Sequence, residues 1–236
     1  MKHLKTCACI VAWLLLTPAQ SQELKSWQLG VRVAPEYSYR AIPRDYPPAL
    51  LDFITRETRN ANELPQLGLT AGMRACYGWK KHFSLEAGLQ YAHRGYHTKR
   101  NVFLSLTHNG NPDGYLTYSR DYHSLAIPLG INFHTGTGKL RWLASIHISP
   151  DYILSRKAIT KFESSFNYSS DNTDKNLRKF NIYAAGGGGI TYPLNAQLQL
   201  RLEILFRHSL LEVSKGAFEP MHLWSAGLDF GLYYQL

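Results

Sequence analysis

The sequence predicts an all-β fold: an eight-stranded antiparallel transmembrane β-barrel with up-and-down meander topology. Three observations favour it. Apolar and polar residues alternate with a period of two over segments of roughly 9–11 residues or more, long enough for a tilted strand to cross a bilayer. Short and long connections between these segments alternate along the chain. After the N-terminal segment, no apolar run reaches the roughly 20 residues of a spanning helix.

The last segment shows the alternation most clearly. Trp224, Leu228 and Phe230 share one face, and Ser225 and Asp229 lie on the other. The same pattern recurs upstream, and the predicted strands span, in order, 27–39, 67–77, 83–91, 123–133, 140–152, 180–192, 196–208 and 222–236.

The connections predict the orientation of the barrel. Short turns follow the second, fourth and sixth predicted strands. Long connections follow the others, at 40–66, 92–122, 153–179 and 209–221, and a short helix is expected within 44–60. Bacterial single-chain barrels have an even strand number, short periplasmic turns and long extracellular loops. We therefore expect both chain ends on the periplasmic side.

The N-terminus has the pattern of a secretory signal. Lys2 and Lys5 precede a short apolar stretch at 10–16, and small residues at 19–21 offer a cleavage site. We expect a signal peptide at 1–21, which is removed, and a barrel domain at 22–236. Cys76 is then the one remaining cysteine, which excludes a disulfide framework.

Charge and export together indicate the partners. Removal of Lys2 and Lys5 leaves 24 basic residues against 17 acids, a net charge of +7. An exported protein does not routinely meet nucleic acid, so we expect none as a partner. The expected partners are outer-membrane lipid with anionic head groups, the barrel assembly machinery, and an unknown protein or glycan at the extracellular loops.

The polar faces supply the candidate interior residues. If the apolar face meets lipid, the charged residues of the opposite face line the lumen, where they must pair because buried charges are costly alone. An eight-stranded interior is just wide enough to be filled by side chains. We predict no open pore but a lumen salt-bridge network of five basic and five acidic residues: Arg32, Glu36, Arg74, Glu86, Arg141, Asp151, Arg201, Glu203, Arg207 and Asp229.

Aromatic residues gather near the ends of the apolar faces. Outer-membrane barrels carry girdles of aromatic side chains at both membrane interfaces. The predicted aromatic girdle comprises Trp27, Tyr37, Tyr77, Phe83, Trp142, Tyr152, Tyr192, Phe206, Trp224 and Tyr234.

Two sequence patterns suggest a phosphate-binding loop or a hydrolase site, but neither meets the requirements of that site. The four glycines at 186–189 lack the Lys-Ser/Thr of a phosphate loop and lie within a predicted strand, where glycines let a sheet curve and make room for large side chains. Ser145, His147, Ser149 and Asp151 share one strand face, but alternate residues lie about 6.6–6.8 Å apart, too far for a nucleophile–base hydrogen bond. We expect no catalytic residues.

Histidines could ligate a metal, but the sequence favours none. His93, His97, His108 and His123 show no recurring ligand spacing and are expected to be solvated loop residues. We therefore expect neither a metal site nor a cofactor.

Two segments resemble a known family. LTAGMRACYGWKKHFSLEAGLQYAHRGYHTK resembles the second and third strands of PorT-like outer-membrane β-barrel proteins, and YHSLAIPLGINFHTGTGKLRWLASIHISPDYIL is similar to their fourth and fifth. The resemblance implies an outer-membrane barrel. The family name refers to a member tied to a protein secretion and gliding machinery, and most relatives have no assigned activity. The final residue departs from the pattern, because such barrels often end in Phe and this chain ends in Leu236.

These features predict a non-enzymatic barrel of the bacterial outer membrane with a structural or loop-mediated binding role. Three alternatives remain open at this point. The chain could be an outer-membrane enzyme with a polar site at the barrel mouth, or a component of a secretion machinery. It could also be an exported soluble barrel that, like a lipocalin, holds an apolar ligand inside, which would invert the two strand faces.

Overall fold

The computed structural model describes residues 26–42, 57–103, 114–136, 139–163, 168–172, 178–213 and 221–236. The expected signal peptide at 1–21 and His108 lie outside these ranges. Within them, residues 57–62 are helical, whereas most of the segment where a short helix was expected, 44–56, is not described.

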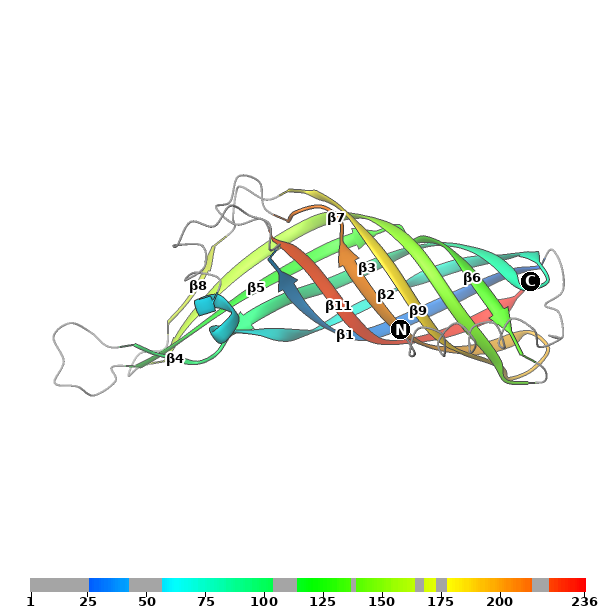
Figure 1. Cartoon of the computed structure of the whole chain (residues 1–236), viewed down its shortest axis with the longest axis horizontal. Coiled ribbons are helices and arrows are strands. Elements are labelled where there is room, and N and C mark those ends of the chain that lie inside the picture. Colours follow the sequence, from blue (N-terminus) through cyan, green and yellow to red (C-terminus); the bar gives the residue numbers. More distant parts are fainter. Residues whose placement is uncertain are drawn as a thin grey trace, which may run out of the picture.

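The described chain forms a closed antiparallel sheet (Figure 1). Its strands are β1 (Trp27–Ala41), β2 (Glu63–Lys80), β3 (Phe83–Thr98), β4 (Asn101–Phe103), β5 (Gly114–Ala126), β6 (Leu129–Thr135), β7 (Arg141–Glu163), β8 (Tyr168–Asn172), β9 (Phe180–Pro193), β10 (Leu198–Ser209) and β11 (His222–Gln235). Pairing of β1 with β11 closes the ring.

The strands β5 and β6 are two parts of one barrel strand. Both pair with β3 on one side and β7 on the other. The break falls at Pro128, which has no N–H to donate to the ladder, while its carbonyl accepts from the Gly88 N–H at 3.0 Å. With β4 and β8 as short additions, the ring has eight strands, and the predicted eight-stranded antiparallel barrel is confirmed.

Several predicted strand ends and loops are wrong, because the strands continue past the apolar stripe. β3 runs to Thr98, β5 begins at Gly114, and β7 runs to Glu163, inside the expected loops 92–122 and 153–179. β2 likewise begins at Glu63, inside the expected loop 40–66. Several outward residues there are polar, among them His93, Asp121 and Lys157, so the regular alternation ends while the ladder continues. We call residues 92–103, 114–124 and 153–163 the sheet extension, which carries β4 and β8 at the left in Figure 1.

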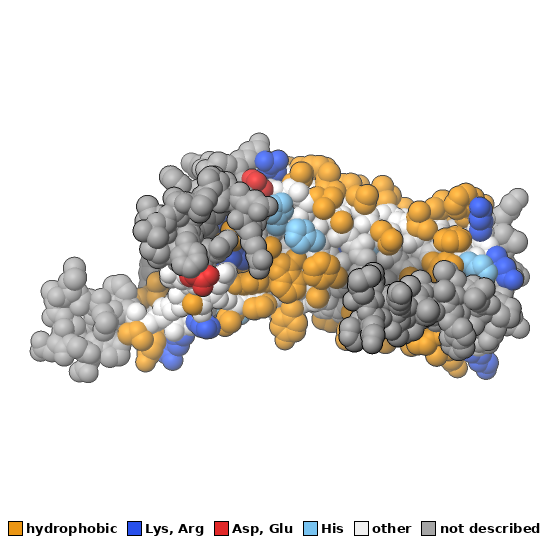
Figure 2. Space-filling model, viewed as in Figure 1, with side chains coloured by type: hydrophobic (Ala, Val, Ile, Leu, Met, Phe, Trp, Pro, Cys, Tyr) orange, Lys and Arg blue, Asp and Glu red, His pale blue; other side chains and the backbone are white. Residues whose placement is uncertain are grey.

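The apolar stripes face outward. Ile146 is 73% exposed and Ile204 67%, and Figure 2 shows apolar side chains over the barrel wall. Polar residues of the same strands are buried. The lipocalin-like alternative is therefore wrong, because it requires the apolar faces inside. In the described part of the chain, no helix is long and apolar enough to cross a membrane.

The predicted girdle residues all point outward and fall in two bands. Trp27 and Tyr77 lie 4.9 Å apart between ring centroids at the short-turn end, and Phe206 and Trp224 lie 5.9 Å apart toward the other end. On β7, Trp142 and Tyr152 are ten residues apart. At about 3.3 Å per residue and a tilt near 40°, that separation is roughly 25 Å, the height of an outer-membrane barrel's apolar band.

Candidate functional site

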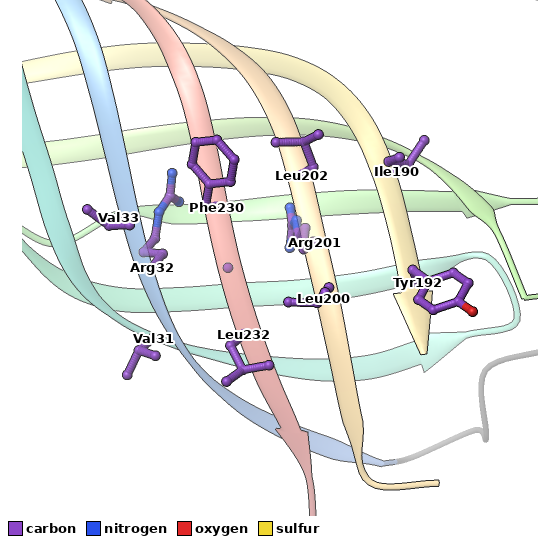
Figure 3. Close-up of a pocket in the computed structure, with 11 residues that line it drawn as sticks. Val31, Arg32, Val33, Ile190, Tyr192, Leu200, Arg201, Leu202, Phe230 and Leu232 are labelled. Atoms are coloured by element: carbon purple, nitrogen blue, oxygen red, sulfur yellow. The ribbon is translucent and has the colours of Figure 1, made fainter. Parts of the chain in front are cut away.

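The interior is built by the inward positions of the strands. On β1, Arg32 is 5% exposed between Val31 and Val33, which are 56% and 43% exposed. On β10, Arg201 is 6% exposed between two outward leucines. Figure 3 shows these arginines on the same strands as the apolar side chains of the outer wall. Period-two geometry thus separates a charged interior from an apolar exterior.

One group of interior residues surrounds Glu86, and we call it the lower hub. Arg74 and Arg201 donate to its carboxylate, the latter at 2.7 Å. Asn132 donates at 2.9 Å, and the ring of His147 lies 3.1 Å away. Side chains from β2, β3, β6, β7 and β10 therefore converge on one buried carboxylate and tie opposite parts of the wall together.

A second group, the upper hub, surrounds Glu36. Its carboxylate, 1% exposed, accepts from Arg94 at 2.9 Å, from Thr70 at 2.7 Å, from Ser225 at 3.0 Å and from Arg207. Arg94 also donates to Asp151 at 3.0 Å, which links the hub to β7.

Nine of the ten predicted interior charges are buried and fall in or between the hubs. Arg32 pairs with Asp229, and Arg201 donates to Glu203 at 3.2 Å. Arg141 differs, because it lies partly exposed at the short-turn mouth, outside both hubs.

Arg94 belongs to the upper hub but was missed from the sequence, because the predicted third strand ended at Tyr91. The sequence did contain a signal for Arg94. That residue lies an even number of positions from Glu86 and Gln90, so all three point to the same side of β3, and all three are buried.

Above the upper hub, side chains close the barrel at the extension end. The buried cluster contains Tyr96, Tyr122, Ile153, Tyr183, Val213, Met221 and Leu223. The guanidinium carbon of Arg94 lies 4.7 Å from the Tyr183 ring centroid, a cation–π contact that joins this cluster to the hub.

Some interior glycines make room for the hubs. A Cβ built on Gly130 would lie 2.1 Å from His147 Cδ2, and one on Gly88 would lie 2.6 Å from Arg74 Cδ. Within 186–189, Gly187 and Gly189 lie against Glu203. These positions therefore have a packing role in the barrel wall.

The Ser, His and Asp of β7 do not form a catalytic array. Ser149 donates to Asp151 at 2.7 Å, Ser145 donates to Glu203, and His147 contacts Glu86. The structure instead brings Ser84 Oγ to 3.1 Å from His134 Nε2 across β3 and β6, a pair that sequence reasoning missed. Both residues are buried within the lumen.

Of the four histidines expected in loops, the three within the described ranges lie in strands. His93 on β3 and His123 on β5 stack on the outer wall with ring centroids 4.8 Å apart, and His97 also lies on β3. Asp121 Oδ1 lies 3.3 Å from His93 Nε2. Over the described residues, no group of three or more ligand side chains is arranged to hold a metal ion.

Comparison with known proteins identifies the family. A family model described as "Outer membrane protein beta-barrel domain" matches residues 19–213. No curated protein matches.

Similar solved structures include OprG of Pseudomonas aeruginosa (12% identity, 92% of this chain and 99% of that chain, TM-score 0.48). Neisserial surface protein A (9%, 89% and 97%, 0.47) and the outer membrane protease OmpT of Escherichia coli (8%, 92% and 99%, 0.42) are also similar. The family match spans most of the chain and carries the assignment. This chain belongs to the outer-membrane β-barrel domain family, which implies that it resides in the bacterial outer membrane.

Proposed function

We propose that this barrel is a non-enzymatic outer-membrane protein whose filled lumen blocks conduction and whose extracellular sheet extension binds an anionic surface glycan. The observation that carries the proposal is the paired ladder of β5 and β7, which continues past the apolar belt from Tyr122–Arg156 to Tyr115–Glu163. A rigid ladder outside the membrane holds recognition residues in place more firmly than a loop does.

The surface chemistry of the sheet extension favours an anionic partner. Lys99, Arg100, Lys157 and Lys161 are exposed there. The guanidinium carbon of Arg100 lies 3.7 Å from the Tyr115 ring centroid, and Glu163 holds its Nη2 at 2.7 Å. Guanidinium and ammonium groups donate charge-assisted hydrogen bonds to carboxylate and sulfate oxygens, which acidic glycans carry.

The two hubs support a closed lumen. Their carboxylates and guanidinium groups lie at the centre of the barrel, and the buried aromatic cluster lies above them. An enzyme would need space for a substrate beside its reacting groups, and Ser84 and His134 are packed within the hub side chains. These features favour a binding role over catalysis.

The PorT-like assignment is part of this proposal, and it rests on the two segments quoted above, 69–99 and 122–154. The resemblance itself assigns no role, because most relatives have no assigned activity, and a place in a secretion machinery is the alternative function. The sheet extension would then contact a protein rather than a glycan.

The test is binding of the purified, detergent-solubilised barrel to immobilised dextran sulfate. A triple variant, Lys99→Gln, Arg100→Gln and Lys161→Gln, is expected to lose at least tenfold in affinity. The matched control removes three exposed lysines near the short-turn end, Lys80, Lys81 and Lys139.

The control variant is expected to bind within twofold of the wild type. Equal weakening by both triple variants would contradict a site on the sheet extension, because only net charge would then matter. Wild-type protein that does not bind at low salt would also contradict the proposed glycan binding.

A further inference from the structure

The short-turn mouth of the barrel contains a polar cavity separate from the two hubs. Its volume is 280 Å³, just below the range of about 300–1,000 Å³ typical of drug-sized ligand pockets. Inward residues at the ends of five strands line it: Gln28 of β1, Arg141 of β7, Thr191 of β9, Gln199 of β10 and Tyr233 of β11. The size suits a small ligand.

Backbone pairing fixes the walls of this mouth cavity. Arg141 pairs with Thr191, and Gln199 pairs with both Pro193 and Tyr233. The turn between β9 and β10 forms the rim, where Asn195 Oδ1 accepts from the backbone N–H of Gln197 at 2.8 Å and of Leu198 at 2.7 Å. The cavity is therefore held open by ladders and a closed turn before any ligand arrives.

Tyr233 forms the floor of the cavity. Its ring occupies the space that side chains at Gly30 and Gly231 would fill, since a Cβ at either position would lie within 2.6 Å of the ring. The Arg201 guanidinium carbon lies 5.6 Å from the ring centroid on the hub side. Tyr233 thus separates the mouth cavity from the lower hub, so a ligand would contact the mouth residues without disturbing the ion pairs.

The charge of the lining favours an anion. Arg141 is the charged residue among those that line the cavity, and no acid is among them. Its Nε is buried and has no hydrogen-bond partner within the described part of the chain. A buried guanidinium N–H without a partner is costly, and an oxyanion would satisfy it with a charge-assisted bond.

The neutral groups add a second element of recognition. Gln28 is 7% exposed and Thr191 1%, and Gln199 also lines the cavity, so three neutral polar side chains accompany Arg141. Amide and hydroxyl groups can both donate and accept. They suit a ligand whose anionic group is flanked by amide or hydroxyl groups.

We propose that the mouth cavity is a binding site for a small oxyanion, with Arg141 binding the anionic group and Gln28, Thr191 and Gln199 contacting its polar flank. A carboxylate of a peptide-like compound and a phosphate ester share this chemistry. Because the short turns face the periplasm in barrels of this family type, the ligand would be a periplasmic one.

The test is isothermal titration calorimetry of the purified full-length mature barrel in detergent, in Tris buffer, with two probes. N-acetylglycine represents the carboxylate source and inorganic phosphate the phosphate source. At least one probe is expected to bind, and the one that binds more tightly identifies the source. Binding of neither probe at 50 mM would overturn the proposal.

Two variants and one control test the residues. Arg141→Gln is expected to weaken the bound probe at least tenfold. Lys139→Gln removes the same charge from an exposed position two residues away and is expected to change affinity less than twofold. Gln199→Leu is expected to weaken N-acetylglycine more than phosphate if the carboxylate source is correct.

Heat-modifiable migration on gels verifies that each variant is folded. Equal losses in Arg141→Gln and Lys139→Gln would overturn the proposal, because binding would then follow net charge alone. If Arg141→Gln does not fold, Thr191→Val and Gln199→Leu replace it, and unchanged affinity for both probes in these two variants would likewise overturn it.

Discussion

Replacement of Glu36 by Gln is expected to lower the free energy of unfolding by about 3–5 kcal/mol, the cost of removing one partner from a buried ion pair. Glu36 is 1% exposed and accepts from Arg94, Arg207, Thr70 and Ser225. Gln keeps the shape of the side chain but removes its charge and one acceptor.

Most of this destabilisation should arise at Arg207, which would be left with the weakest remaining interactions. After the substitution, Arg94 keeps its 3.0 Å bond to Asp151. Arg207 keeps only a 3.8 Å approach to Asp229, which is already paired with Arg32. A hydrogen bond to a charged group contributes about 1.5–3 kcal/mol, so losing most of the compensation for a buried guanidinium is consistent with the larger figure.

A double-mutant cycle isolates this pair. Removing both charges with Glu36→Gln and Arg207→Gln should cost at least about 2 kcal/mol less than the sum of the single variants, because neither charge is then left alone. The assay is urea unfolding in lipid vesicles followed by tryptophan fluorescence. A cost below about 1 kcal/mol for Glu36→Gln, or additive single costs, would refute the buried network.

Three further predictions concern the wall and the lumen. Gly130→Ala should destabilise the barrel by about 1–3 kcal/mol or more, because its Cβ would lie 2.1 Å from His147 Cδ2. Gly186→Ala should be neutral or stabilising, since the nearest atom to its Cβ is 3.8 Å away; urea unfolding measures both. Ile204→Arg, at a lipid-facing position 67% exposed, should cost about 2–4 kcal/mol in vesicles. His208→Arg lies four residues farther along the same strand, toward the membrane interface, and should cost about 0–1 kcal/mol. In planar bilayers, the protein should give no ohmic, voltage-stable conductance.

Each of these predictions has a contrary result. Equal stability of Gly130→Ala and Gly186→Ala would mean that the interior is looser than the structure indicates. Equal costs for Ile204→Arg and His208→Arg would remove the depth dependence that lipid imposes. Steady conductance would mean that water and ions pass the two hubs.

Because successive side chains of a strand point to opposite faces, much of the interior could be predicted from the sequence. Once apolar residues were assigned to lipid, alternate positions such as Arg32, Glu86 and Arg201 had to point inward, and the structure buries them. The alternation of the two faces does not show which interior charges pair with each other. Glu36 on β1 and Arg207 on β10 are 171 positions apart in the sequence. Their contact depends on how β11 pairs with both strands where the ring closes.

The limits of the strands could not be predicted in the same way. Lipid imposes an apolar residue at each outward position, but above the membrane that requirement ends while hydrogen bonding continues. His93 and Asp121 face outward on paired strands beyond the belt, and so their segments had the pattern of loops. Arg94 was lost from the predicted network for this reason.

The central claim is that the apolar face of each strand contacts hydrocarbon and the charged face is turned inward. Nitroxide labels at Leu228→Cys and Leu200→Cys, in a Cys76→Ser background in lipid vesicles, test it by their collision rates with oxygen and with a polar nickel chelate. We predict high accessibility to oxygen and low accessibility to the chelate at both positions, which are 44% and 45% exposed on the outer wall. Labels shielded from both reagents, or reached by the chelate, would contradict the account.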